Sequence, residues 1–115
     1  WTPAEVELRP EAVDPSWIVE GEPQWWTTET WSNADRTTVC GCFRSTPGKF
    51  QYAPPADEIT FVRGGVVLVT AGDGSTQEFR TGDVMSIRAG ASLIFDVREA
   101  LEDTWVWSAT EPIEG

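Results

Sequence analysis

Histidine is absent from the chain, and several other residue types are scarce. The 115 residues include two cysteines, one methionine, one tyrosine and eight basic side chains against nineteen acidic ones. The lack of imidazole removes the nitrogen ligand that most often holds a transition metal, and it leaves no histidine to activate a thiolate. The net charge of −11 repels phosphate backbones, so we expect no nucleic-acid partner.

Long hydrophobic runs are missing as well. No apolar run approaches the roughly 20 residues that a helix needs to cross a bilayer, so we expect no membrane partner. No charged and then apolar leader precedes the domain, although the chain starts at Trp1 rather than at methionine. A chain of this length holds one hydrophobic core and is too short for two, which predicts a single domain.

The two cysteines, Cys40 and Cys42, are separated by one glycine in a β-type run, so their side chains share one face of a strand. A disulfide between them would be strained, and we therefore expect two free thiols in a reducing compartment, the cytoplasm. A two-thiolate metal site is the alternative. Because the chain offers no further cysteine and no histidine, ordinary buried cysteines are the favoured interpretation.

Short β-type runs separated by turn residues fill the stretch from Pro47 to Gly90. The runs at 58–63 and 66–70 have only Gly64-Gly65 between them, which predicts a tight two-residue hairpin. Further turns are predicted at 72–74, 81–83 and 89–90, and further strands at 76–79 and 84–87. No segment shows a sustained helical period, so the pattern predicts an all-β sandwich or small barrel.

Three segments divide the chain: an N-terminal arm at 1–16, the domain at 17–110 and an acidic tail at 111–115, which we expect to be mobile. The arm has a short alternating run that includes Val6 and Leu8. Such an arm either trails in solvent or adds a strand to a neighbouring sheet edge. Outside the central stretch we expect strands at 24–31, 37–44, 92–97 and 103–109, and a polar bend at 98–102.

Seven tryptophans are an unusually high number for one small domain. They could fill the core and a subunit interface, or they could line a ligand pocket. Trp105 and Trp107 share a face of the last predicted strand and are the best candidates for the pocket or core, whereas Trp25, Trp26 and Trp31 suit an interface. This excess of tryptophan, together with the N-terminal arm, predicts a homodimer.

The order of motifs over about 21–107 resembles the cupins, in particular the single-domain cupins related to the ureidoglycine aminohydrolase cupin domain. The resemblance rests on Gly21-x-Pro23 before a Trp-rich strand, the Asp35 turn, the segments 46–50 and 63–68, Asp57-Glu58, and the segments 81–84 and 88–90. It implies a cupin double-stranded β-helix, which is an all-β jelly-roll barrel of two antiparallel sheets with a pocket in its wider mouth. It also implies that dimers are common, often with an N-terminal strand that pairs with the sheet of the partner.

The resemblance fails at the residues that would bind a metal. Metal-binding cupins use two or three histidines and a carboxylate or amide, and the corresponding positions here are Tyr52, Pro54, Glu58 and Leu93. Only Glu58 is a good ligand, and the usual proline of the second motif is Arg88. We therefore expect no bound metal and no cofactor.

The favoured function is that of a metal-free cupin that binds a small molecule. Its expected ligand-binding residues are Tyr52, Thr60, Arg88, Leu93, Phe95, Trp105 and Trp107, around Glu58. The alternative is a hydrolase or isomerase that acts on a small amide-like or sugar-like metabolite, with Glu58 as acid/base and Arg88 or Tyr52 as orienting groups. A third interpretation is a purely structural dimer with a closed barrel. For Glu58 itself, the alternative to a proton carrier is a structural carboxylate that is hydrogen-bonded to Tyr52, Arg44 or Arg88. The sequence names no substrate.

Overall fold

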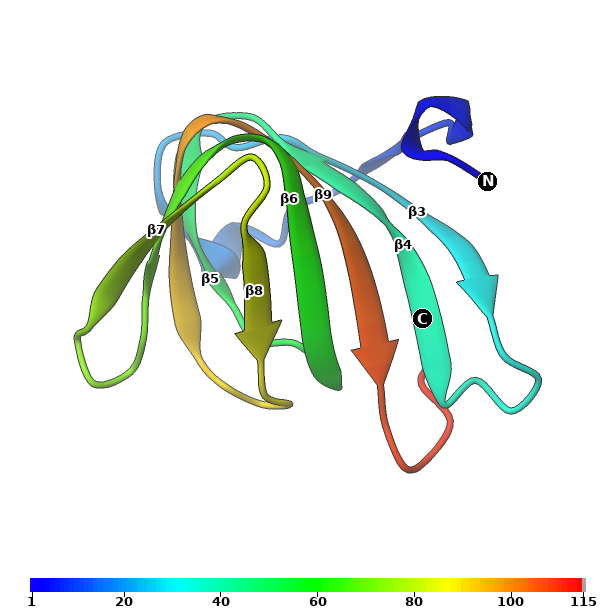
Figure 1. Cartoon of the computed structure of the whole chain (residues 1–115). Helices are drawn as coiled ribbons and strands as arrows, with labels where there is room; N and C mark the ends of the chain where they lie inside the picture. The colour runs from blue at the N-terminus through cyan, green and yellow to red at the C-terminus, as the bar shows by residue number, and fades with distance from the viewer. Residues whose placement is uncertain (115) are drawn as a thin grey trace.

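A computed structural model describes residues 1–114, and Gly115, the last residue of the predicted acidic tail, lies outside the described residues. The regular secondary structure of the described chain is almost entirely strand and forms a strongly curled antiparallel sheet (Figure 1). The predicted all-β jelly roll is confirmed. Within the described part of the chain, no helix is long and apolar enough to span a membrane.

The chain begins with two short 3-10 helices and two short strands, and its two longest strands are β6 and the last strand, β9. In order they are η1 (Pro3–Glu5), β1 (Arg9–Glu11), η2 (Pro15–Trp17), β2 (Ile18–Glu20), β3 (Trp25–Ser32), β4 (Thr38–Ser45), β5 (Gly48–Tyr52), β6 (Asp57–Thr70), β7 (Thr76–Arg80), β8 (Val84–Ile87) and β9 (Leu93–Ser108).

Two long strands, β6 and β9, run side by side through the whole molecule and join its two halves (Figure 1). The first part of β6 pairs with β8 and its last part with β7. The first part of β9 pairs with β5 and its last part with β4. The edge strands β1 and β2 then pair with β3 and β5. The curled sheet therefore has two walls that share β6 and β9.

Neither the predicted hairpin at Gly64-Gly65 nor the predicted bend at 98–102 reverses the chain. Both segments lie inside continuous strands, and they face each other, with Gly64 opposite Glu102 and Val66 opposite Glu99. The pairing register shifts at this place, as it does at a β-bulge. The two predictions were wrong because a glycine pair between β-type runs marks a bulge as well as a hairpin.

Gly65 allows β6 and β9 to bend together where their pairing register shifts. Its φ of +87° lies in the left-handed region, and a Cβ atom placed there would lie 2.2 Å from the carbonyl oxygen of Ala100 on β9. Gly64 is different, because its added Cβ would meet its nearest neighbour, the Glu102 side chain, at an ordinary 3.6 Å. The close approach of the two long strands therefore depends on one glycine of the pair.

Gly65→Ala is expected to lower the free energy of unfolding by about 3 kcal/mol, since strained backbone and overpacking each cost about 1–3 kcal/mol. The matched control, Gly64→Ala, is expected to change it by less than about 1 kcal/mol. Urea unfolding of the three proteins measures both values. Equal losses for the two variants would contradict this account of the bend.

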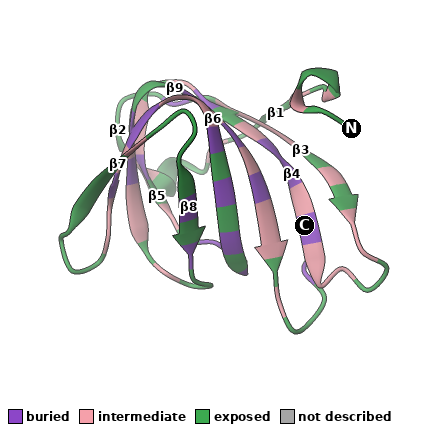
Figure 2. Ribbon diagram, in the orientation of Figure 1, coloured by how far each residue is buried: buried purple, intermediate pink, exposed green. Residues whose placement is uncertain are grey.

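Alternation along the strands sends one face of each wall into the interior, as the alternating burial along β6 shows (Figure 2). Two buried clusters result. The larger contains Phe50, Val62, Val67, Val69, Met85, Ile87, Phe95, Val97 and Leu101, and the smaller contains Val39, Ala56, Trp105 and Ile113.

Segments near both ends of the described chain contact the sheet. In the arm, β1 adds an edge strand to β3 of the same chain, with Pro10 opposite Trp26. In the tail, Ile113 is buried, and its backbone N–H donates to the carbonyl oxygen of Arg36 over 2.8 Å. The Arg36 guanidinium in turn donates to the Ile113 carbonyl oxygen. The prediction of a mobile tail is therefore wrong at Ile113, because the sequence shows no partner for this single apolar residue.

Candidate functional site

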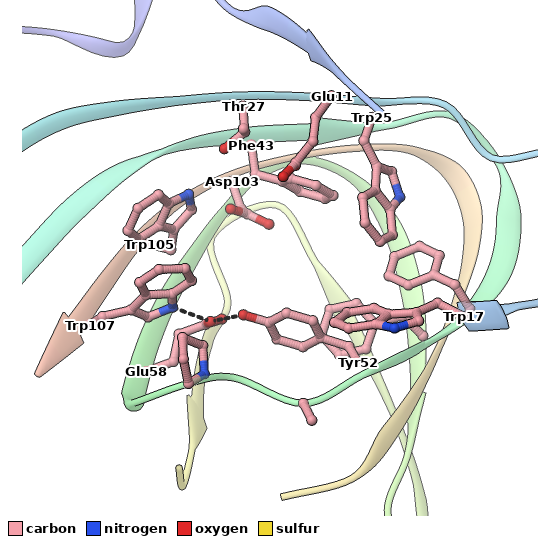
Figure 3. A pocket seen from close by; sticks show the side chains of 14 residues that line it. Glu11, Trp17, Trp25, Thr27, Phe43, Tyr52, Glu58, Asp103, Trp105 and Trp107 are labelled. Carbon is pink, nitrogen blue, oxygen red and sulfur yellow. Dashed lines mark hydrogen bonds between the residues drawn. The ribbon is translucent and has the colours of Figure 1, made fainter. Parts of the chain in front are cut away.

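A cavity of about 360 Å³ lies between the two walls of the curled sheet (Figure 3). This volume falls in the range of small-molecule sites, about 300–1,000 Å³. Most of the lining side chains are aromatic, and a few carboxyl groups lie among them. The lining residues are Glu11, Trp17, Trp25, Thr27, Phe43, Phe50, Tyr52, Ala53, Pro55, Glu58, Phe95, Asp103, Trp105 and Trp107.

The inward faces of β3, β4, β5, β6 and β9 supply most of this lining, because alternate residues of these strands point to the same side. Two further residues, Glu11 on β1 and Trp17 in η2, come from the N-terminal region and cover the cavity from the side. A glycine on β4 makes room for the Trp105 ring, since a Cβ atom on Gly41 would lie 2.5 Å from that indole. The site is therefore built mainly on rigid strands.

The aromatic rings contact one another around the cavity. The rings of Trp105 and Trp107 lie 4.4 Å apart between centroids, and the ring of Tyr52 lies 5.2 Å from that of Phe95. Trp25 packs edge-on against Phe50, with centroids 4.9 Å apart. Edge-on and tilted contacts of this kind hold rings in fixed orientations, so the lining is preorganised.

Glu58 lies at the base of the cavity, and both of its carboxylate oxygens accept hydrogen bonds. The Trp107 indole N–H donates to Oε1 over 2.7 Å, and the Tyr52 hydroxyl donates to the same oxygen (Figure 3). The Thr60 hydroxyl donates to Oε2. Glu58 is only 5% exposed, so these three donors replace water around the carboxylate.

Tyr52 stays a proton donor in this arrangement. Its burial and then the negative charge of Glu58 raise the pKa of the Tyr52 hydroxyl far above its usual value. The phenol therefore keeps its proton at any physiological pH. It orients Glu58 and is a poor metal ligand.

Asp103 is the second buried carboxyl group of the cavity, and its environment differs from that of Glu58. Its side chain points into the cavity, is 4% exposed, and has no hydrogen-bond partner at Oδ1 among the described residues (Figure 3). Burial and then the charge of Glu58 raise the pKa of Asp103 well above its usual value, against a lowering by Arg63. A carboxyl group in such surroundings holds its proton more tightly than an exposed one.

The structure brings together most of the residues predicted for the site, but not all of them. Five of the eight line this cavity, and Thr60 is buried behind them, bonded to Glu58. The five are Tyr52, Glu58, Phe95, Trp105 and Trp107. Arg88 and Leu93 instead line a second cavity of about 350 Å³ beside β7 and β8, and Arg88 is exposed. Leu93 shares a face with Phe95 but lies two residues nearer the start of β9, about 7 Å along the strand.

Arg44, a suggested partner of Glu58, lies elsewhere. Its guanidinium is 4.0 Å from the Glu102 carboxylate and stacks over the Trp26 ring, 5.2 Å from the ring centre. Of the tryptophans assigned to an interface, Trp25 lines the cavity and Trp31 is 53% exposed. Of the two cysteines, both free thiols, Cys42 is buried and Cys40 is half-buried.

Sequence reasoning missed Asp103, Trp17 and Glu11 as site residues. Asp103 shares its strand face with Trp105 and Trp107, so the alternation that selected the two tryptophans also points to it. No local pattern places Trp17 or Glu11, because packing of the N-terminal segment against distant strands brings them to the cavity.

The residues at the four positions that correspond to metal ligands do not fit a transition metal. Tyr52 is a protonated phenol bonded to Glu58, Pro54 and Leu93 have no side-chain donor, and Glu58 is the single suitable ligand. Among residues 1–114, no three histidine, cysteine, aspartate or glutamate side chains lie close enough to share a metal ion. Asp103, with its raised pKa, does not complete a set of ligands.

Comparisons with known proteins agree with this architecture. A family model described as an EutQ-like cupin domain matches residues 32–105, more than half of the chain. No curated protein matches the sequence.

Solved structures that share the fold come from several bacteria. A protein described as ethanolamine utilization protein Q from Salmonella typhimurium LT2 is 26% identical, with 76% of this chain and 72% of that chain covered and a TM-score of 0.66. A DUF861 protein of unknown function from Pseudomonas syringae pv. tomato DC3000 is 21% identical. The match covers 89% of this chain and 44% of that chain, with a TM-score of 0.79. The Clostridium difficile EutQ protein is 20% identical. The match covers 76% of this chain and 65% of that chain, with a TM-score of 0.66.

Proposed function

The chain belongs to the EutQ-like cupin family, and we propose that it binds a small organic molecule in the aromatic cavity without a metal. The observation that carries this proposal is the preorganised lining, in which packed rings surround a carboxylate held by three donors. Small-molecule sites typically combine such an apolar wall with a few fixed polar groups. Fold alone does not assign the function, since cupins host many activities.

An enzymatic role for Glu58 is the weaker proposal. An acid/base group needs a lone pair or a proton free to reach the substrate, but three donors already engage Glu58. Of the two expected orienting groups, Tyr52 donates to Glu58, whereas Arg88 lines the second cavity. The relation to ureidoglycine aminohydrolase-type cupins also stays a proposal. Tyr52 and Glu58 support this relation, because they lie together at positions that correspond to metal ligands in those cupins. Leu93 counts against it, because its side chain has no donor at another such position.

We further propose a homodimer in the cytoplasm. The outer face of β6 and β8 exposes three large apolar side chains, Ile59, Phe61 and Val84, and two copies could cover this patch symmetrically. The free thiols of Cys40 and Cys42 support a reducing compartment, and fractionation of the source cells tests that location.

Native mass spectrometry of the purified protein tests both the bound molecule and the assembly. We expect the mass of a dimer, together with a small organic compound that is released on denaturation. Thr27→Trp, which fills the cavity, should abolish the adduct, whereas Gln77→Trp in the second cavity should keep it. A monomer mass would contradict the dimer. An adduct that survives Thr27→Trp, or a protein that neither carries a compound nor responds to any metabolite in a fluorescence screen, would contradict the binding function.

A further inference from the structure

We infer that the ligand of the aromatic cavity is a small organic cation of the ammonium class, held against the tryptophan rings with its positive end near Asp103. This inference rests on the proposed function and adds the charge of the ligand. Three independent features of the cavity lead to it: the sign of its charged groups, an unpartnered buried oxygen, and the aromatic faces around that oxygen.

All charged members of the lining are acidic. Of the fourteen described residues around the cavity, three are carboxylic acids, namely Glu11, Glu58 and Asp103, and none is lysine or arginine. The rest of the protein adds to this field, because the net charge is −11. A negative cleft with low-dielectric walls attracts cations and disfavours anions.

The Asp103 carboxyl group is available to a ligand. Its Oδ1 is buried and has no hydrogen-bond partner among the described residues, whereas both oxygens of Glu58 already accept hydrogen bonds. Arg63 acts on Asp103 only from a distance, since its guanidinium makes no ion pair with Asp103 in the described chain and its own Nε is unpartnered. A buried polar oxygen without a partner is costly, and a cation that reaches it from the cavity would relieve that cost.

The rings around Asp103 suit a compact positive charge. Phe43, Trp25, Trp105 and Trp107 lie around the interior into which the carboxyl group points (Figure 3). The faces of such rings carry negative potential and attract ammonium groups, most strongly where water is excluded. A neutral ligand would gain only the apolar contact, and an anion would meet carboxyl groups.

Binding should release a proton. Burial and the charge of Glu58 raise the pKa of Asp103 well above its usual value, so this group keeps its proton to a higher pH than an exposed aspartate does. Arg63 acts in the opposite direction, and Glu11 and Tyr52, whose pKa values are also raised, are the other titratable groups at the cavity. A bound cation favours the ionised form of Asp103. Affinity should therefore rise with pH by up to about tenfold per unit, until Asp103 is ionised in the free protein.

Three probes of nearly the same shape test the inference: choline, its neutral isostere dimethylbutanol with carbon in place of nitrogen, and the anion dimethylbutanoate. Tryptophan fluorescence and calorimetry measure their affinities for the full chain. We expect choline to bind at least about tenfold more tightly than dimethylbutanol, and dimethylbutanoate to bind most weakly. Asp103→Asn should weaken choline binding about tenfold and leave dimethylbutanol unchanged, whereas Glu99→Gln, which removes an exposed carboxylate, should change neither.

The outcomes separate this inference from the proposed function. If dimethylbutanol binds as tightly as choline, or if Asp103→Asn leaves choline binding intact, the ligand class is wrong and the cavity remains a small-molecule site. If none of the three probes binds, the ligand class is also wrong, and the native mass of the purified protein then decides the binding function separately.

Discussion

Glu58→Ala is expected to lower the free energy of unfolding by about 3 kcal/mol or more, because each buried polar group left without a partner costs about 1–3 kcal/mol. The substitution removes the acceptor of three donors, those of Tyr52, Thr60 and Trp107, at a residue that is 5% exposed. Urea unfolding at neutral pH measures the loss.

Glu58→Gln is the matched variant. Its amide oxygen can accept from Tyr52 and Trp107, and its NH₂ group can donate to the Thr60 hydroxyl, so the loss should be about 1 kcal/mol. Trp107→Phe removes one of the three donors and should cost a similar amount. If Glu58→Gln destabilised the protein as much as Glu58→Ala, the negative charge of Glu58 rather than its acceptor oxygens would hold the site together.

Asp103→Asn is expected to stabilise the protein at neutral pH. The folded-state pKa of Asp103 lies above its unfolded value, so as pH rises the unfolded chain loses this proton first. The wild type therefore keeps its full stability below the unfolded pKa and loses part of it as pH rises towards the folded pKa. Asparagine does not ionise, and each unit of pKa elevation that it removes is worth about 1.4 kcal/mol.

The pH dependence distinguishes this effect from simple repacking. The gain of Asp103→Asn should vanish below about pH 4, where aspartate is protonated in both states, and should grow towards neutral pH. In a Glu58→Gln background the gain should shrink, because the charge of Glu58 contributes to the raised pKa. A gain that is the same at every pH would show that the raised pKa of Asp103 is not its cause. The stabilised variant is also the one that we expect to bind choline less well, as functional sites commonly trade stability for binding.

Local sequence patterns predicted the small elements well. The strand at 84–87 and the turn at 72–74 occur as predicted, because alternation and turn residues are local signals. The same signals failed at Gly64-Gly65 and at 98–102. Both segments look like chain reversals in isolation, and only the pairing of β6 with β9 over their whole lengths shows that they are opposite parts of one bend.

The site was predictable to the extent that it depends on strand faces. Tyr52 and Glu58 followed from the resemblance, and Trp105 and Trp107 from alternation along the last strand. Asp103 lay on that same face. From the sequence alone, an acidic residue beside two tryptophans is expected to face solvent. Only the pairing of β9 with a strand on each side shows that this residue is in the interior. Contacts between distant segments, such as Trp25 against Phe50, have no local signal.

Elemental analysis of protein purified without added metal tests whether the aromatic cavity is a metal-free site. We expect no stoichiometric manganese, iron, nickel or zinc, because the corresponding positions offer one carboxylate, one protonated phenol and two side chains without donors. Glu58→Gln should leave the metal content unchanged. Near-stoichiometric transition metal in the wild type that is lost in Glu58→Gln would contradict a metal-free binding site.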